Sequence, residues 1–294
     1  MTPADHAQHW RGRERWVVLA TRFDAPDFVA LWRHWREDPQ RCDALHLIAI
    51  VEHPLTRDEL AATAVDASAQ TTVQALWQAL LDAWPPATPD LHTLAFDAGR
   101  VQLQLAFGEP ARWLREIVAQ VDAFEIAASD AAGTPVDMRA LARLAAPGAW
   151  LNTGALAPSA LRTLTAAGFM VDAASASATR ARFTPGFIAP HRAAAATHVP
   201  PSERRALIVG GGLAGCAAAW ALAERGWRSS VFDAHAQPAG GASGNPAGLF
   251  HAVVHAHDGV HARLLRTAAL QACMQVAIAL REHSVAGSNV CDAF

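Results

Sequence analysis

The chain of 294 residues contains neither lysine nor tyrosine, and it has only four cysteines. The first absence excludes a Schiff-base or general-base lysine, and the second excludes a tyrosine acid, from any catalytic scheme. The cysteines lie far apart, without C-x-x-C spacing, at Cys42, Cys216, Cys273 and Cys291. This pattern argues against disulfides and zinc and favours buried, reduced thiols in a cytoplasmic protein.

Long apolar runs and an excess of positive charge are also missing. Hydrophobic residues make up 52% of the chain, yet no uninterrupted run reaches the roughly 18 residues of a transmembrane helix. Residues 1–11 lack the apolar core of a signal peptide, so we expect a globular, cytoplasmic protein that does not enter a membrane. The net charge of −3 gives no bulk attraction for nucleic acid. Local arginine clusters are therefore interpreted as solvated faces in preference to a tRNA contact surface; they are Arg11, Arg13 and Arg15, then Arg180, Arg182 and Arg192, then Arg204 and Arg205.

A glycine-rich turn is the most informative feature that is present. Residues 206–209 are apolar, and Gly210, Gly212 and Gly215 follow as G-x-G-x-x-G. The first glycine allows a tight turn, the second lets the backbone approach a pyrophosphate, and the third lets a helix pack closely on a strand that we expect to be buried on both faces. A second strand ends at Asp233, whose carboxylate can bind a ribose 2′-hydroxyl and so favours FAD or NAD over NADP. This order of features along the sequence predicts a dinucleotide-binding βαβ unit, and the alternative is an ordinary glycine-rich turn.

A second run of small residues, 240–248, bears on the choice between FAD and NAD. It reads Gly-Gly-Ala-Ser-Gly-Asn-Pro-Ala-Gly, and small side chains with free N–H groups suit a wall against a long cofactor. This segment resembles the D-amino-acid-oxidase-like flavoproteins. It resembles more closely the flavin half of the bifunctional tRNA 5-methylaminomethyl-2-thiouridine biosynthesis proteins. The resemblance implies FAD as the cofactor, with Ser243 and Asn245 beside it.

The first two-thirds of the chain alternate between expected strands and helices. The expected strands are 16–19, 45–51, 91–96, 101–107, 121–126, 149–152 and 169–171, and the expected helices are 27–35, 71–84, 136–146 and 158–167. This alternation predicts an α/β, Rossmann-like, doubly wound sheet with helices on both faces. A proline-stiffened connector, 193–204, is expected to separate a domain of residues 1–192 from an incomplete FAD-binding domain of residues 205–294.

Residues 1–192 resemble the methyltransferase half of the same family, best over 32–46, 53–55, 91–108 and 140–148. The resemblance implies a role at the wobble uridine of tRNA. In that role the flavin half oxidatively removes a carboxymethyl group, and the other half methylates the exposed amine from S-adenosylmethionine.

Three positions depart from the family's S-adenosylmethionine site. Its glycine-rich turn after the first strand is replaced by residues 20–27, which hold Arg22 and Phe23 but no glycine. Its ribose-binding acid falls on Val51, and the acid of its third signature falls on Ala128. We therefore expect this half to keep its fold and to have lost methyl transfer.

The flavin half has only 90 residues from Arg205 onward (294 − 205 + 1). We expect the chain to be truncated and to hold FAD weakly, and we predict no catalytic residue. The alternatives are a non-catalytic remnant with a binding or scaffolding role, and an NAD-dependent dehydrogenase, which fits the turn but not residues 240–248. Metal binding is disfavoured because no glutamate completes a His-Glu-x-x-His frame among His251, His255, His257 and His261.

Overall fold

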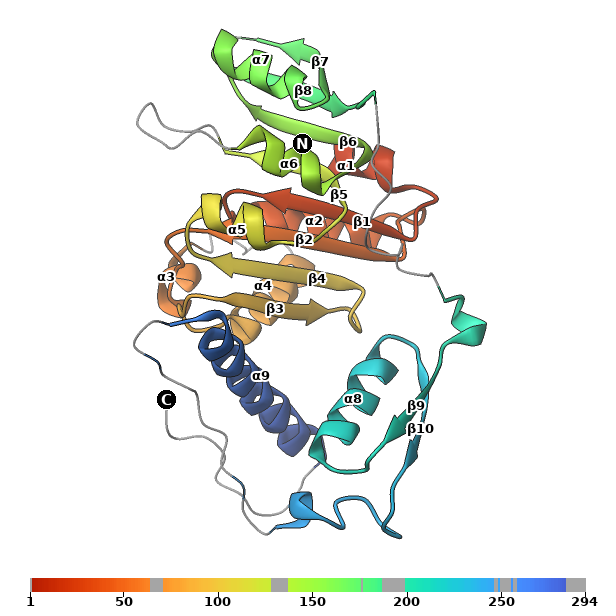
Figure 1. The fold of residues 1–294 in the computed structure, drawn as a ribbon. Helices are drawn as coiled ribbons and strands as arrows, with labels where there is room; N and C mark the ends of the chain where they lie inside the picture. The colour runs from red at the N-terminus through yellow and green to blue at the C-terminus, as the bar shows by residue number, and fades with distance from the viewer. Residues whose placement is uncertain are drawn as a thin grey trace. The chain divides into compact units, whose positions relative to one another are not determined.

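A computed structural model describes residues 2–63, 71–127, 137–175, 177–186, 199–245, 248, 255 and 258–283. The chain divides into two compact units, Met1–Ala193 and Ala194–Phe294. Each unit has a sheet of its own (Figure 1). Across the described ranges, no helix combines the length and the apolar character that crossing a bilayer requires.

The first unit is built on an eight-stranded sheet with the order β3-β4-β2-β1-β5-β6-β8-β7. Its strands are β1 (Arg15–Ala20), β2 (Ala44–Val51), β3 (Leu91–Phe96), β4 (Val101–Phe107), β5 (Val121–Ile126), β6 (Ala145–Gly154), β7 (Phe169–Ala174) and β8 (Ala178–Phe183). Strands β4, β2, β1, β5 and β6 run parallel, whereas β3 and the β8–β7 pair form antiparallel edges. The predicted α/β class, with a largely parallel sheet, is confirmed.

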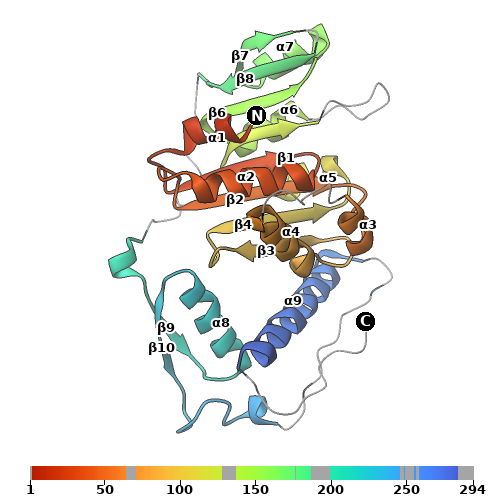
Figure 2. The same ribbon diagram turned by 180° about the vertical axis from the view of Figure 1, so that it is seen from behind.

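Helices cover both faces of this sheet. They are α1 (Pro3–Trp10), α2 (Ala25–Glu37), α3 (Arg57–Ala62), α4 (Thr71–Ala83), α5 (Pro110–Glu116), α6 (Met138–Leu144) and α7 (Pro158–Ala166). Figure 2 shows α1, α2 and α4 in front of the sheet, and Figure 1 shows α5, α6 and α7 in front of its other face. One face buries a core around Trp16 and Phe28, and the other a core around Phe124 and Leu141. Two separate apolar layers therefore hold the sheet, as in a doubly wound fold.

Six buried tryptophans pack into the first core; they are Trp10, Trp16, Trp32, Trp35, Trp77 and Trp84. Buried indoles need an acceptor for their N–H group. Trp10 donates to the Asp38 carboxylate at 2.8 Å, and Trp35 donates to the Cys42 carbonyl at 3.0 Å. These six rings therefore serve the core of the first unit.

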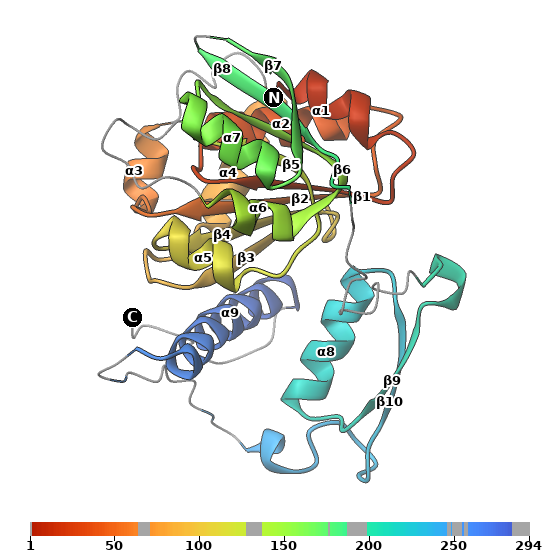
Figure 3. The same cartoon turned by 45° about the horizontal axis from the view of Figure 1, so that its top comes forward.

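The second unit contains a parallel pair of strands joined through a helix (Figure 3). Its elements are β9 (Arg205–Val209), α8 (Leu213–Glu224), β10 (Arg228–Phe232) and α9 (Val260–His283). Helix α8 ends at Glu224, and Gly226 follows its C-cap residue with a left-handed φ of +74°. Trp227 N–H donates to the Leu222 carbonyl at 2.9 Å, as in a glycine-terminated helix end. The order strand, helix, strand is confirmed.

The prediction that β9 is buried on both faces is wrong. Leu207 is 77% exposed and Val209 is 91% exposed, and α8 buries none of its side chains. The reason is architectural, because the second unit's sheet contains two strands among the described residues. An apolar strand sequence indicates a covered strand only when other layers of the fold are present to cover it.

Candidate functional site

The three glycines of the turn have distinct structural roles. Gly210 has a φ of +103°, which a residue with a side chain rarely adopts, and its N–H donates to the Phe232 carbonyl at 2.7 Å. A Cβ on Gly215 would lie 1.8 Å from the Gly210 carbonyl oxygen, so only glycine lets α8 begin this close to the turn. A Cβ on Gly212 would lie 2.7 Å from the hydroxyl oxygen of Ser243. Because Gly212 has no side chain, there is room beside it for the Ser243 side chain.

Asp233 lies directly beside this turn, at the end of β10. Its Oδ2 accepts the Gly211 N–H at 2.6 Å, and its Oδ1 accepts the His235 N–H at 2.7 Å. The His235 ring nitrogen Nδ1 lies 2.8 Å from the same Oδ1. The hydrogen bond from Gly211, followed by those from His235, lowers the pKa of Asp233 to about 2. The turn therefore carries a fixed negative charge throughout the physiological pH range.

His235 belongs to this site although the sequence analysis did not select it. The available signal was its spacing, because an aspartate whose side chain accepts the N–H two residues later forms an Asx turn. Its imidazole also packs close to the glycine loop, since a Cβ on Gly240 would lie 2.6 Å from the His235 Cβ. His235 thereby links the acid to the second run of small residues.

Ser243 reaches the N-terminus of α8 from a short 3₁₀ helix, Ala242–Gly244. Its hydroxyl oxygen accepts the Leu213 N–H at 3.1 Å, which satisfies a donor that α8 itself leaves unpaired. Asn245 follows, exposed, and its N–H donates to the Ala242 carbonyl at 3.3 Å. The structure thus brings Gly210, Gly212, Gly215, Asp233 and Ser243 together, and Asn245 ends the loop that carries Ser243.

The cysteine prediction is wrong at one position near this site. Cys216 is exposed, not buried, whereas Cys42 is buried as expected. The reason is that α8 buries no side chain, so the first turn of the helix leaves its thiol accessible. The Cys216 Sγ lies 3.6 Å from the Gly211 carbonyl oxygen. Cys42, Cys216 and Cys273 form no disulfide with one another, and Cys291 lies outside the described residues.

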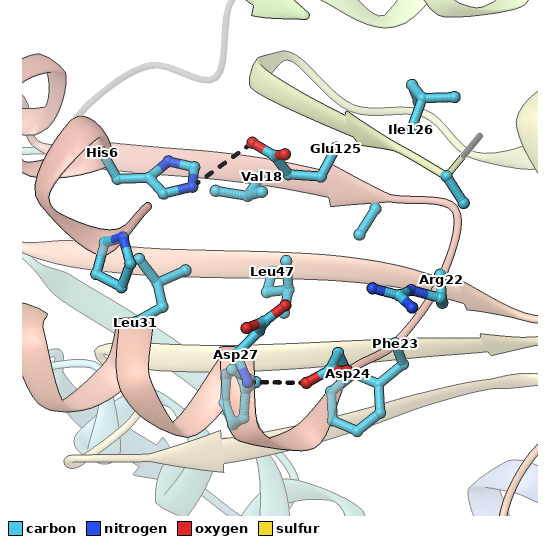
Figure 4. A pocket seen from close by; sticks show the side chains of 14 residues that line it. His6, Val18, Arg22, Phe23, Asp24, Asp27, Leu31, Leu47, Glu125 and Ile126 are labelled. Atoms are coloured by element: carbon cyan, nitrogen blue, oxygen red, sulfur yellow. Dashed lines mark hydrogen bonds and ion pairs between the residues drawn. The ribbon is translucent and has the colours of Figure 1, made fainter. Parts of the chain in front are cut away.

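A second candidate site is a cavity of about 250 Å³ at the carboxyl ends of β1 and β5 (Figure 4). Ligands of open α/β sheets usually bind at this end of the strands. Its lining combines apolar residues with charged ones, among them Arg22, Asp24, Asp27 and Glu125. The cavity is the position at which a methyltransferase-like half would hold its methyl donor.

Two features of this cavity bear on whether it could hold S-adenosylmethionine. The Phe23 ring packs against Trp84, with ring centroids 5.4 Å apart, and fills the turn where open backbone is required. The Asp24 side chain accepts the Asp27 N–H at 3.0 Å and so caps the N-terminus of α2. A helix N-terminus attracts a ligand carboxylate, but this one already carries a carboxylate. Ala128 lies outside the described residues, and Val51 closes β2 without an acid.

His6 and Glu125 form a pair on the wall of this cavity that the sequence did not predict. Trp16 donates its indole N–H to His6 Nδ1 at 3.1 Å. Because an indole can only donate, the imidazole is neutral at Nδ1 and carries its proton on Nε2, which lies 3.7 Å from Glu125 Oε1. Burial lowers the pKa of His6 to about 3, and burial raises the pKa of Glu125. The pKa values of the two groups are therefore shifted in opposite directions from their ordinary values.

Metal ligation finds no support in the part of the chain that the structure describes, because no three histidine, cysteine or acidic side chains converge there. His255 lies in a loop and His261 on α9, whereas His251 and His257 lie outside the described residues.

Comparison with known proteins connects the turn to a flavin family. Residues 205–288 match the model of the FAD dependent oxidoreductase family. The chain is 45% identical over 281 residues to the tRNA 5-methylaminomethyl-2-thiouridine biosynthesis bifunctional protein MnmC of Methylibium petroleiphilum, covering 89% of this chain and 41% of that protein. The protein of the same name from Burkholderia ambifaria is 42% identical over 275 residues, covering 90% and 42%. The resemblance inferred from the sequence is confirmed.

The chain spans about two-fifths of the length of the curated relatives it matches. Among solved structures, MNMC2 from Aquifex aeolicus aligns with a TM-score of 0.44 at 14% identity, over 63% of this chain and 58% of that one.

Proposed function

Because the chain is homologous to the tRNA 5-methylaminomethyl-2-thiouridine biosynthesis bifunctional proteins over nine-tenths of its own length, we propose that its second unit binds FAD for a tRNA-modifying oxidation. The observation that carries the proposal is the Asp233 carboxylate bonded to the glycine turn at 2.6 Å. This bond brings the ribose-binding acid and the phosphate-binding turn of a dinucleotide site into one place. A tRNA substrate would place the activity in the cytoplasm.

Each site residue has a separate part in holding the cofactor. The backbone from Gly210 to Gly212 would bind the pyrophosphate at the N-terminus of α8, where the helix dipole favours an anion. Asp233 would accept hydrogen bonds from the adenosine ribose. Ser243 and Asn245 would line the cofactor from the second loop, where a small residue on each side leaves the backbone accessible. Gly215 would act indirectly, since it lets α8 start against the turn.

The chemistry would be removal of a hydride from the carboxymethyl carbon next to the amine nitrogen of a modified wobble uridine. Water would then hydrolyse the resulting imine, which leaves the amine on the uridine and releases the carboxymethyl group as a two-carbon oxo acid. FAD, when bound, supplies the hydride acceptor for such a step. The residues of this chain would bind and orient the adenine end of the cofactor. The hydrogen bonds of Gly210 and Gly211 within the protein hold the backbone of the turn in place before the cofactor arrives, which reduces the ordering that binding requires.

The first unit is proposed to lack S-adenosylmethionine-dependent methyl transfer. Phe23 fills the turn after β1, and Asp24 places a carboxylate at the N-terminus of α2. Both features would weaken binding of the amino-acid end of S-adenosylmethionine. Isothermal titration of the chain with S-adenosylmethionine is expected to give no heat of binding, and a micromolar Kd would overturn this part of the proposal.

A binding or scaffolding protein derived from the same enzymes is the second candidate. One observation favours it, namely the exposure of apolar side chains such as Leu207 and Val209 on β9. Exposed apolar surface of this kind marks protein contacts more often than catalysis. Such a protein would bind a partner through the second unit without retaining a cofactor.

Cofactor titration separates the two candidates. FAD added to the chain is expected to bind saturably, with a change in flavin fluorescence, and NAD is expected to bind at least tenfold more weakly because the loop 240–245 is suited to the longer flavin cofactor. Preference for NAD would favour a dehydrogenase. Absence of binding to either cofactor would favour the scaffolding role.

A further inference from the structure

Two arginine-bearing segments that lie far apart in the sequence meet on one face of the first unit's sheet. Arg180 and Arg182 lie on β8, where they pair in register with Asn152 and Trp150 of β6. Arg13 follows α1 and precedes β1. All three arginines act on His9 of α1, whose pKa is lowered by burial first and then by their positive charges. His9 therefore lies within the electrostatic reach of all three guanidinium groups.

Aromatic rings accompany these charges. The His9 ring stacks on the Trp150 ring with centroids 4.9 Å apart and an interplanar angle of 30°. The Arg182 guanidinium lies 5.3 Å from the centroid of the same Trp150 ring, and Arg13 lies 5.0 Å from that of Trp16. Guanidinium groups layered on rings at this spacing are cation–π contacts. His9 and Arg182 thus pack against the half-buried Trp150 ring, whereas the Trp16 ring beside Arg13 is buried in the core.

This face of the sheet is open beside α1. Side chains alternate along a strand, so Leu151 and Ala181 enter the core under α6 and α7 while Trp150 and Arg182 take the opposite face. Figure 2 shows this face, with α1 next to β6 and none of the drawn helices in front of β7 and β8. Arg180 and Arg182 are both exposed. A long flexible ligand could therefore reach the arginines from solvent.

The charges on this face are incompletely neutralised. Arg13 pairs with Asp122 at 2.8 Å, and Arg180 pairs with Asp5 at 3.8 Å. Arg182 stacks on the Trp150 ring and forms no ion pair among the described residues. The long, exposed pair of Arg180 with Asp5 is worth about 1 kcal/mol or less, so a phosphate could replace this carboxylate at little cost. Asp122, by contrast, is largely buried and also accepts the Val17 N–H at 2.9 Å, so it stays with Arg13.

We propose that the arginine–tryptophan face, consisting of His9, Arg13, Trp150, Arg180 and Arg182, docks RNA. The inference rests on the proposed function and identifies the part of the chain that would hold its RNA substrate. Arginines would contact phosphates, which fix position, and the ring cluster would lie beside unpaired bases. An acidic peptide would match the arginines but not the stacked rings. Because the whole chain has a net charge of −3, the attraction for RNA would come from this local surface and not from the charge of the chain as a whole.

The test measures RNA binding by the full chain with fluorescence anisotropy, using a fluorescein-labelled single-stranded RNA decamer and an unmodified tRNA transcript. The variant R180A/R182A removes two charges from the proposed face. Its matched control, R139A/R162A, removes two exposed arginines from α6 and α7 on the opposite face. Circular dichroism melts check that each variant is folded.

We expect R180A/R182A to raise the Kd about tenfold at low salt and to reduce the slope of log K against log salt by about 1.4, the value for two phosphate contacts on a single strand. The control is expected to stay within about twofold of the parent. The charge-retaining R180K/R182K should keep the parent's salt slope while losing affinity, because lysine preserves the charge but not the planar stacking.

Two results would overturn the proposal. One is equal RNA affinity of R180A/R182A and its control, and the other is a parent chain that binds neither RNA. If the variant loses RNA affinity but the parent binds no FAD, the docking face stands and the flavin proposal fails. If FAD binds and R180A/R182A matches its control, the reverse holds.

Discussion

The Asp233 carboxylate accepts the N–H of Gly211 at 2.6 Å, although helix α8 separates the two residues in the sequence. This bond joins the end of β10 to the turn that follows β9. Asp233 also accepts two donors from His235. The protein's own donors therefore fix the carboxylate in place at the mouth of the turn, where it would meet the ribose of a bound cofactor.

Replacement of Asp233 is expected to weaken FAD binding. D233A removes a charged acceptor whose hydrogen bonds are each worth about 1.5–3 kcal/mol, so the Kd for FAD should rise at least tenfold in a fluorescence titration. D233N keeps one acceptor oxygen and should give an intermediate Kd. The exposed carboxylate of Asp172 on β7 serves as the control, and D172N should leave the Kd unchanged. Equal affinities of D233A and the parent would contradict the assignment.

A methyl group at position 215 is expected to disrupt the turn. The new Cβ of G215A would lie 1.8 Å from the Gly210 carbonyl oxygen and 3.4 Å from Ile208 Cγ2, so α8 or the turn must move. Overpacking of this kind costs about 1–3 kcal/mol, and hydrogen exchange in 205–232 should become faster.

Gly259 provides the matched control for G215A. Its Cβ position is open, with nothing within 4 Å, and G259A should exchange like the parent. Unchanged exchange and unchanged FAD affinity in G215A would show that the close approach of α8 to the turn is dispensable.

Loss of the Ser243 hydroxyl is expected to expose the first turn of α8. S243A removes the acceptor of the Leu213 N–H, a capping bond worth about 1 kcal/mol. Exchange at Leu213 should therefore be faster than in the parent, whereas the exposed strand residue Ser230 serves as a control in S230A. Saturating FAD should abolish the difference, because the pyrophosphate would supply an acceptor for the same N–H group. A difference that persists in FAD would place the pyrophosphate elsewhere.

The buried imidazole of His6 predicts a pH-dependent stability of the first unit. Its pKa falls from 6.5 when unfolded to about 3 when folded, so between these values the unfolded chain binds the extra proton. The stabilising effect of neutral His6 is thus complete above pH 6.5 and is lost as the pH falls toward 3, by up to about 1.4 kcal/mol per pH unit. Glu125, whose pKa is raised, acts in the opposite direction.

Urea unfolding at pH 7.5, 6.0 and 5.0 checks this dependence. In H6N the asparagine side-chain oxygen can still accept the Trp16 N–H, but the residue no longer titrates. The free energy of unfolding should therefore decline less from pH 7.5 to pH 5.0 in H6N than in the parent. H53Q replaces an exposed histidine and should behave like the parent. Parallel pH profiles for the parent and H6N would exclude His6 as the cause.

The sequence predicted the geometry of the glycine turn where local chemistry determines it. The glycine spacing and the acid after the second strand specify a turn that depends on backbone conformation, so Gly210, Gly215 and Asp233 were identifiable without coordinates. The contact between Ser243 and Leu213 spans thirty residues and follows from how the loop folds back. His6 and Glu125 meet only because α1 lies across β5, which no local pattern encodes.

Four elements of the first unit, α1, α3, α5 and β8, were not expected from the sequence, and for α1 and β8 the reason is identifiable. Helix α1 is only eight residues long, and its sequence signal was the capping box between Thr2 and Asp5 instead of an apolar stripe. Strand β8 alternates exposed and buried residues, with Thr179, Ala181 and Phe183 inside. Small and hydroxylated residues at the inward positions weakened the period-two signal, and the arginines between them suggested a solvated surface.

Competition for FAD is the most direct test of the central claim, which is that the glycine turn and Asp233 hold the ADP portion of the cofactor. In an isothermal titration, FAD is added to the full chain in the presence of excess ADP or excess FMN. We predict that ADP abolishes the heat of FAD binding, that FMN leaves it unchanged, and that D233A reduces the affinity for FAD and ADP alike. Displacement by FMN but not by ADP would contradict the account, because the site would then recognise the flavin end and not the adenine end of the cofactor.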